Sequence, residues 1–299
     1  MRGWQIPGAH FSEATAKKHH HPRARLSDTS IFDHEDWRAL FSENDDGLSY
    51  SNYYSTLLVK KAHPDWTNAT QISLEAERQY NAGSQLFFTE TLKVAKKLRP
   101  KGRFGFYEYP MAPSPELLWL WQAVDVLAGS AYLMTANGTA SIVNKSLVAA
   151  AMVEAAGGTR PDILTYVLLW PSAKVVSNDQ MLASIAVPAG LGASGILMWG
   201  SSSDAHVSGY SETITSALQS TVGPLIRKCQ ANVAACGASH CSGHGRCSRY
   251  DWRAPEKSCE APPSPLTLTE EGGEAVACIC DKGFSGAQCS DSKVAQHIV

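Results

Sequence analysis

Apolar and polar positions along the chain form blocks that change period, and these blocks predict helices separated by short strands. Between Ile72 and Leu98 apolar residues recur at helical spacing, and the pattern stops at Pro100. The next block, 103–109, is short and rich in aromatic residues, and it predicts a strand that Pro110 closes. About the first 30 residues are polar and show no period, so no element is predicted there.

The second half of the chain repeats this rhythm with three helices and two strands. In chain order, helix and strand alternate over 141–156, 162–170, 180–191, 195–199 and 211–222. We expect the last of these helices to stop at Gly223-Pro224. Strands that alternate with helices at this spacing indicate crossover units and a parallel sheet, most economically a (β/α) barrel. A doubly wound open sheet is the structural alternative at this point.

Composition supports a globular fold and excludes several classes of protein. The chain has 299 residues, of which 44% are hydrophobic and 18% charged, and this balance argues against a disordered or fibrous protein. A net charge of -2 gives no global positive field, so we expect no nucleic-acid partner. The longest apolar stretch, 147–153, falls far short of the roughly 20 residues that span a bilayer, so no transmembrane segment is expected.

The cysteines indicate an oxidising compartment. Seven of the eight fall between Cys236 and Cys289, and such local density is typical of a disulfide framework. A zinc site is the rival interpretation, but the Cys-x-x-Cys pairs that zinc sites favour are absent. Three Asn-x-Ser/Thr sequons point the same way and make Asn68, Asn137 and Asn144 candidate glycosylation sites.

The N-terminus lacks the apolar core of a secretory signal, which taken alone predicts the cytosol. Because the cysteines disagree, we expect the sequence to be a fragment whose missing beginning carried the signal. The expected location is therefore secreted or lysosomal.

The segment whose residues are best suited to catalysis is Phe32–Arg38, with the sequence Phe-Asp-His-Glu-Asp-Trp-Arg. If it ends a strand, Asp33 and Glu35 point to the same face and place two carboxyl groups side by side. Like charges at that separation raise the pKa of one member, which stays protonated as a general acid while the other stays ionised. Cleavage of a glycosidic bond requires such a pair. A solvated acidic turn before a helix is the alternative interpretation.

Around this motif the chain resembles the hyaluronidases, barrel glycosidases that cut hyaluronan and chondroitin and carry a catalytic Asp-x-Glu in an Asp-x-Glu-x-Trp-Arg frame. The likeness continues, in the same order, over most of residues 30–290. The further similar segments are 91–100, 105–110, 119–133, 192–204 and 241–247.

The resemblance implies a role for each acid. Glu35 is expected to protonate the leaving oxygen and later to act as a base toward water. Asp33 is expected to orient the substrate's own N-acetyl group, whose carbonyl oxygen replaces a protein carboxylate as nucleophile. This reaction needs no metal and no cofactor.

The resemblance also implies substrate-binding residues near the carboxyl ends of strands. Tyr132 is expected to hydrogen-bond the substrate near its N-acetyl group, and Trp199 to form an apolar wall against the acetyl methyl. Ser202, Ser203 and Asp204 are expected to add polar contacts. Ordinary packing is the alternative interpretation for both aromatic residues.

The C-terminal region resembles an epidermal-growth-factor-like module, so we divide the chain into an incomplete barrel, 1–228, and a cysteine-rich module, 229–299. The resemblance implies three disulfides, and it leaves Cys229 and Cys259 as candidates for a fourth. The implied pairs are Cys236 with Cys247, Cys241 with Cys278, and Cys280 with Cys289.

Three departures from the family leave the activity open. Where a second active-site tyrosine is expected, the chain has Leu169-Trp170-Pro171, and 208–213 lacks an expected cysteine. About 30 residues precede Asp33, so we expect the first strands of the barrel to be missing.

The first hypothesis is a monomeric, retaining endo-β-N-acetylhexosaminidase that acts on hyaluronan, with chondroitin as a second candidate substrate. Because such a substrate is a polyanion, a basic residue such as Arg38 would favour the encounter. The second hypothesis is an inactive, adhesive protein that holds a glycan without cleaving it.

Overall fold

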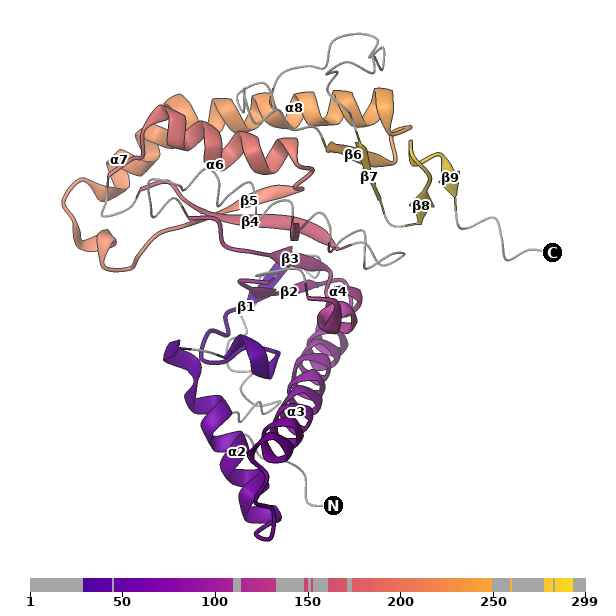
Figure 1. Cartoon of the computed structure of the whole chain (residues 1–299). Coiled ribbons are helices and arrows are strands. Elements are labelled where there is room, and N and C mark those ends of the chain that lie inside the picture. The colour runs from indigo at the N-terminus through magenta and orange to yellow at the C-terminus, as the bar shows by residue number, and fades with distance from the viewer. Residues whose placement is uncertain are drawn as a thin grey trace, which may run out of the picture. The chain divides into compact units, whose positions relative to one another are not determined.

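The structure, a computed structural model, describes most of the chain between residues 29 and 292. It forms two compact units: the first runs to Phe106 and includes Pro115–Val124, and the second holds Tyr107–Ser114 and the chain from Asp125 onward. Figure 1 shows the elements of both units, coloured from indigo at the N-terminus to yellow at the C-terminus. The described residues are 29–44, 46–109, 114–132, 148–149, 152, 161–170, 174–248, 259, 277–281 and 283–292.

The first unit combines a pair of parallel strands with a long helical hairpin. Strand β1 pairs with β2, with Phe32 opposite Phe106. Helix α2 packs against α3, and α3 also packs against α4. The elements are β1 (Thr29–Phe32), η1 (Phe41–Glu43), η2 (Asp46–Leu48), α2 (Tyr50–Ala62), α3 (Ala69–Leu98), β2 (Arg103–Tyr107), η3 (Pro115–Leu117) and α4 (Leu118–Ala123).

Helix α3 carries the core of this unit on one face. The Asn68 side chain caps its first turn by accepting a hydrogen bond from the Gln71 N–H. Its buried residues recur every three to four positions, as an amphipathic helix requires, and Phe88 packs on Phe106 with ring centroids 4.5 Å apart. The predictions of a helix ending near Leu98 and of a strand beginning at 103 are confirmed.

The second unit contains a parallel sheet in the order β3 (Val126–Ala128), β4 (Asp162–Leu168), β5 (Gly195–Trp199). The residues that follow β2 pair with β3, because the Glu108 N–H donates to the Ala128 carbonyl at 3.0 Å. Helix α6 (Asn178–Gly190) begins with a capping box between Ser177 and Gln180 and covers β4 and β5. The predicted parallel half-barrel with helices is therefore confirmed.

The helices after β5 differ from the prediction. Following η6 (Asp204–His206) and α7 (Tyr210–Ala217), the chain makes a π-helical turn over Leu218–Val222 and continues as α8 (Gly223–His240). The predicted stop at Gly223-Pro224 is wrong. A π-turn shifts the hydrogen-bond register, and proline is tolerated in the first turn of the helix that follows. A side chain at Gly223 would collide with the Leu218 carbonyl oxygen, so glycine fits the turn.

Four disulfides join all the cysteines of the second unit, none of which is free. They link Cys229 to Cys259, Cys236 to Cys247, Cys241 to Cys278 and Cys280 to Cys289. These include the three pairs that the resemblance implies, and the two remaining cysteines bond to each other. Small antiparallel ribbons complete the region: β6 (Gly245–Ser248) with β7 (Ala277–Cys280), and β8 (Phe284–Ser285) with β9 (Asp291–Ser292).

The cysteine-rich region packs on the beginning of the parallel strands in the second unit. The Arg246 guanidinium donates to the Gly192 carbonyl at 3.1 Å and lies 3.4 Å from the carboxylate of Asp162, the first residue of β4. Gly192 has a φ of +86°, and a side chain there would collide with Ile279. Helix α8 supplies Cys229 and Cys236, so it runs unbroken through the predicted boundary at 228.

Some predictions fall outside the described residues. The sequons at Asn137 and Asn144 lie there, as does the alanine-rich segment 141–156 apart from positions 148, 149 and 152. Across the part of the chain that is described, no helix combines the length and the apolar character needed to cross a bilayer.

Candidate active site

The two predicted acids follow directly on β1 and lie in what we call the acid segment, Asp33–Arg38. Asp33 and Glu35 are exposed, whereas His34 between them is half-buried. The His34 ring contacts Trp37 and Phe87, with ring centroids 4.5 and 5.5 Å away. Burial lowers the pKa of His34 below its ordinary 6.5, so its neutral form is favoured. The alternation expected of an extended segment is therefore present, and His34 anchors the segment to the aromatic residues of the first unit.

A buried asparagine fixes the backbone at the end of the acid segment. Asn44 is fully buried, and its Oδ1 accepts a hydrogen bond from the Arg38 N–H at 2.8 Å. Its Nδ2 donates to the carbonyls of Arg38 and Leu40, at 3.2 and 2.6 Å. Sequence reasoning missed Asn44, because an asparagine beside Asp45-Asp46-Gly47 has the composition of an ordinary turn.

Tyrosines complete this support. The Tyr80 hydroxyl donates to the Arg38 carbonyl at 2.7 Å, and the Tyr50 hydroxyl donates to the Asp36 carbonyl. Burial raises the pKa of Tyr80, so its hydroxyl stays protonated and keeps its role as donor. The acid segment is thus held through its main chain, while the side chains of Asp33 and Glu35 are exposed.

The second unit contains a set of aromatic side chains that we call the aromatic group: Tyr107, Tyr132, Tyr166 and Trp199. The hydroxyls of Tyr107 and Tyr132 are 3.0 Å apart. The Tyr132 and Trp199 rings lie 5.8 Å apart with a tilt of 31°, and Tyr107 meets Tyr166 edge-on at 4.9 Å. The structure therefore brings the predicted Tyr132 and Trp199 together and adds two tyrosines that sequence reasoning did not place in the site.

Each member of the aromatic group is presented by a strand or by the residues that follow one. Trp199 is the last residue of β5 and is 43% exposed, so packing in the core does not account for it. Tyr132 follows β3, and the Ala131 N–H next to it bonds to the Tyr166 carbonyl at 2.8 Å. Burial raises the pKa of Tyr132, and its hydrogen bond to Tyr107 raises it further, so its hydroxyl stays neutral.

A polar turn follows Trp199. Ser202 and Ser203 are exposed, Asp204 is partly exposed, and the Ser203 hydroxyl is 2.7 Å from that of Ser201. A side chain at Gly200 would lie only 2.8 Å from the Trp170 Nε1, so glycine allows the turn to approach that indole. Trp170, in the segment Leu169-Trp170-Pro171 where the resemblance implies a second active-site tyrosine, is 6% exposed and belongs to the core.

One cluster of described residues has the composition of a metal site. Sulfur and nitrogen atoms of Cys236, His240 and Cys247 lie within 4.8 Å of one another. The two sulfurs are joined in a disulfide, so neither is available as the thiolate that zinc requires.

Parallel strands covered by helices, an exposed carboxylate pair after one strand and aromatic side chains at the ends of others are features of a barrel glycoside hydrolase. The family model described as hyaluronidase matches residues 8–114 and 111–285. The chain therefore belongs to the hyaluronidase family of glycoside hydrolases.

Individual relatives agree. The chain is 27% identical to hyaluronidase-1 of Sus scrofa, over 90% of this chain and 72% of that protein. It is 28% identical to hyaluronidase-3 of Homo sapiens, over 95% of this chain and 74% of that protein.

Solved structures of bee venom hyaluronidase are also similar. One has a TM-score of 0.60 at 25% identity and covers 67% of this chain and 71% of its own. Another, in complex with a hyaluronic acid tetramer, has a TM-score of 0.59 at 26% identity and covers 65% and 67% of the two chains.

Proposed function

We propose that the protein hydrolyses hyaluronan internally, at N-acetylhexosaminide bonds, with chondroitin as a second substrate. The observation that carries this proposal is the acid segment: two exposed carboxyl groups follow β1 and flank an anchored His34, in a chain of the hyaluronidase family. The bee venom enzyme, whose fold is similar, has been captured with a hyaluronic acid tetramer, which supports the choice of substrate.

The proposed mechanism uses the substrate's own N-acetyl group. Asp33 accepts a hydrogen bond from the amide N–H, and the amide carbonyl oxygen attacks the anomeric carbon while Glu35 protonates the leaving oxygen. A cyclic oxazolinium intermediate results. Glu35, now a carboxylate, then takes a proton from a water molecule, which opens the ring on the original face. Two inversions give net retention, and no metal or cofactor takes part.

The aromatic group supplies binding in this proposal. The exposed Trp199 indole offers an apolar surface for the acetyl methyl, and the neutral Tyr132 hydroxyl offers a hydrogen bond to the substrate. Ser202, Ser203 and Asp204 add polar groups just beyond the strand end. Four disulfides fit a protein of the secretory route, so we propose that it acts outside the cell or in lysosomes, as a monomer.

The variant Glu35→Gln tests the proposal because it removes the proton donor and keeps the size of the side chain. Cleavage, followed by the size of hyaluronan and by new reducing ends, should fall on the order of 10²- to 10⁴-fold, while binding to immobilised hyaluronan persists. Asp36→Asn is the matched control: Asp36 is also an exposed acid of the segment, and its replacement should leave the rate within about twofold. Equal loss in both variants would contradict the assignment of Glu35.

An adhesive function is the second candidate, and one observation favours it. The segment Leu169-Trp170-Pro171, where the resemblance implies a second active-site tyrosine, contains no tyrosine, and its Leu169 and Trp170 are buried. If the unaltered protein binds hyaluronan but never shortens it, the chain is a glycan-binding member of the family.

A further inference from the structure

The start of α3 combines a helix cap with an attachment sequence. Asn68, Ala69 and Thr70 form an Asn-x-Thr sequon, and all three residues are exposed. Asn68 caps the helix through Oδ1, which accepts a hydrogen bond from the Gln71 N–H at 3.1 Å. An N-linked oligosaccharide is joined to Nδ2, so a glycan and the cap use different atoms of one side chain. Modification therefore does not require α3 to lose its first turn.

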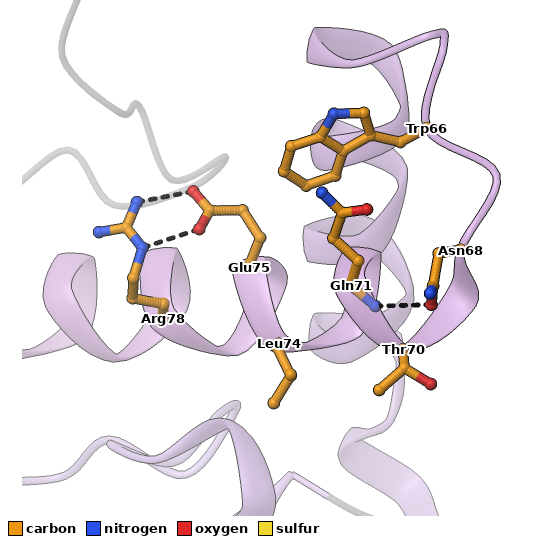
Figure 2. A pocket seen from close by; sticks show the side chains of 7 residues that line it. All are labelled: Trp66, Asn68, Thr70, Gln71, Leu74, Glu75 and Arg78. Atoms are coloured by element: carbon orange, nitrogen blue, oxygen red, sulfur yellow. Dashed lines mark hydrogen bonds and ion pairs between the residues drawn. The ribbon is translucent and has the colours of Figure 1, made fainter.

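An open groove of about 450 Å³ lies beside this asparagine (Figure 2). Its apolar surfaces come from Trp66 and from Leu74, which is 61% exposed. His63 stacks on the Trp66 indole with ring centroids 4.0 Å apart and holds it in place. The volume falls within the range of small-molecule sites, and the groove begins at Asn68 itself.

The groove also carries polar groups about two and three turns along α3 from Asn68. Arg78 donates two hydrogen bonds to the Glu75 carboxylate, at 2.8 and 2.6 Å. This pairing lowers the pKa of Glu75 to about 2, so the acceptor stays ionised. Figure 2 shows Gln71 beneath the Trp66 indole, between the cap and this ion pair. Trp66 and Leu74 thus offer apolar surface, and Gln71 and the ion pair offer hydrogen-bonding groups beside it. A sugar ring can use both, because one of its faces is apolar and its hydroxyls lie at the rim of the ring.

We propose that Asn68 carries an N-linked glycan and that its innermost N-acetylglucosamine lies in this groove against Trp66 and Leu74. The sugar covers the exposed Leu74 and stabilises the turn between α2 and α3. The disulfides of the second unit are typical of proteins made on the secretory route, where such glycans are added. A glycan at Asn68 does not depend on the proposed catalytic activity.

Occupancy is tested first, in the full chain produced by a secreting eukaryotic cell line. Trypsin releases residues 62–78 as one peptide, because Lys61 precedes it and Arg78 ends it. Enzymatic deglycosylation in heavy-oxygen water should convert Asn68 to a labelled aspartate in the wild type and in Thr70→Ser, and not in Thr70→Ala, which keeps the capping asparagine. An unmodified peptide from secreted wild-type protein would overturn the proposal.

The position of the innermost N-acetylglucosamine in the groove is tested by thermal unfolding before and after deglycosylation. On deglycosylation the midpoint should fall by about 2–4 °C more in the wild type than in Thr70→Ala, which corresponds to about 1 kcal/mol for the groove contact. The fall in Thr70→Ala itself measures the effect of any glycans at other positions. In Trp66→Ala this extra loss should shrink to less than half. Leu74→Gln, at an exposed position, should also reduce the extra loss, and it serves as the test if Trp66→Ala fails to fold. An extra loss that is unchanged in these variants would overturn the groove assignment.

Discussion

The acid segment and the aromatic group are built in opposite ways. The acid segment is one continuous stretch whose main chain is held by Asn44, Tyr80 and Tyr50, while its carboxyl side chains are exposed. The aromatic group is assembled from positions as distant as 107 and 199, and its side chains hold one another.

This difference predicts how each region responds to mutation. In the acid segment, the support and the proposed chemistry are carried by different residues. We therefore expect that the carboxylates can change without loss of fold, and that the supports can change without loss of charge. In the aromatic group the same rings pack on each other and are proposed to bind substrate, so each substitution should disturb both properties.

The largest effect is expected when the support of the acid segment is removed. Asn44→Ala removes three hydrogen bonds to the main chain of Arg38 and Leu40. It should therefore lower the free energy of unfolding by about 3 kcal/mol in urea titrations, or about 1 kcal/mol for each bond. Asn52→Ala is the matched control, since Asn52 makes a single hydrogen bond to the Asn44 carbonyl, and it should cost about 1 kcal/mol. Equal costs for the two variants would show that Asn44 has no special role.

The next effect concerns substrate affinity. Trp199→Ala should raise the KM for hyaluronan about 2- to 10-fold, because a lost aromatic contact is worth about 0.5–1.5 kcal/mol. The exposed fraction of 43% predicts that stability changes by less than about 1 kcal/mol. Trp199→Phe should retain most of the affinity. An unchanged KM in the alanine variant would remove Trp199 from the site.

A smaller effect is expected within the aromatic group. Tyr107→Phe and Tyr132→Phe each remove one hydroxyl of the pair that is 3.0 Å apart. A double-mutant cycle on the free energy of unfolding should give a coupling of about 1 kcal/mol. Additive costs would mean that the two hydroxyls do not support each other.

The smallest effect is a pH dependence in the acid segment. Because burial lowers the pKa of His34, the unfolded chain takes up a proton on this residue before the folded protein does. The stability that His34 contributes is present above pH 6.5 and is lost as the pH falls through the lower, folded value. His34→Phe should flatten the slope of unfolding free energy between pH 7 and pH 5 relative to the wild type. A slope that does not change would contradict the buried, neutral state of His34.

Local patterns in the sequence predicted several elements of both units, but α2, α4 and β3 were not predicted. The spacing of apolar residues gave α3 to its last residue, and short apolar runs gave β4 and β5, because these signals depend on near neighbours. The alternation of Asp33, His34 and Glu35 followed from an extended backbone alone. The prediction at Gly223-Pro224 was wrong, because a π-turn with its own register carries the helix through residues that usually end one.

The sequence was less informative about groups that meet only in the fold. Tyr107 and Tyr166 are 59 positions apart in the numbering, and nothing in either strand marks its ring as part of a group with Trp199. Asn44 supports the main chain of residues that lie earlier in the sequence, so its role depends on a reversal of the chain. What could have indicated Tyr166 is its strand, since parallel strands present their carboxyl ends at one edge.

Arg246 and Gly192 tie the cysteine-rich region to the strand beginnings of the second unit, whereas Trp199 closes the opposite edge. The cysteine-rich region therefore supports the edge of the sheet at which the parallel strands begin. Because the region lies at that edge, it can vary in length or acquire insertions without altering the proposed substrate-binding surface near Trp199, so the two parts can evolve separately.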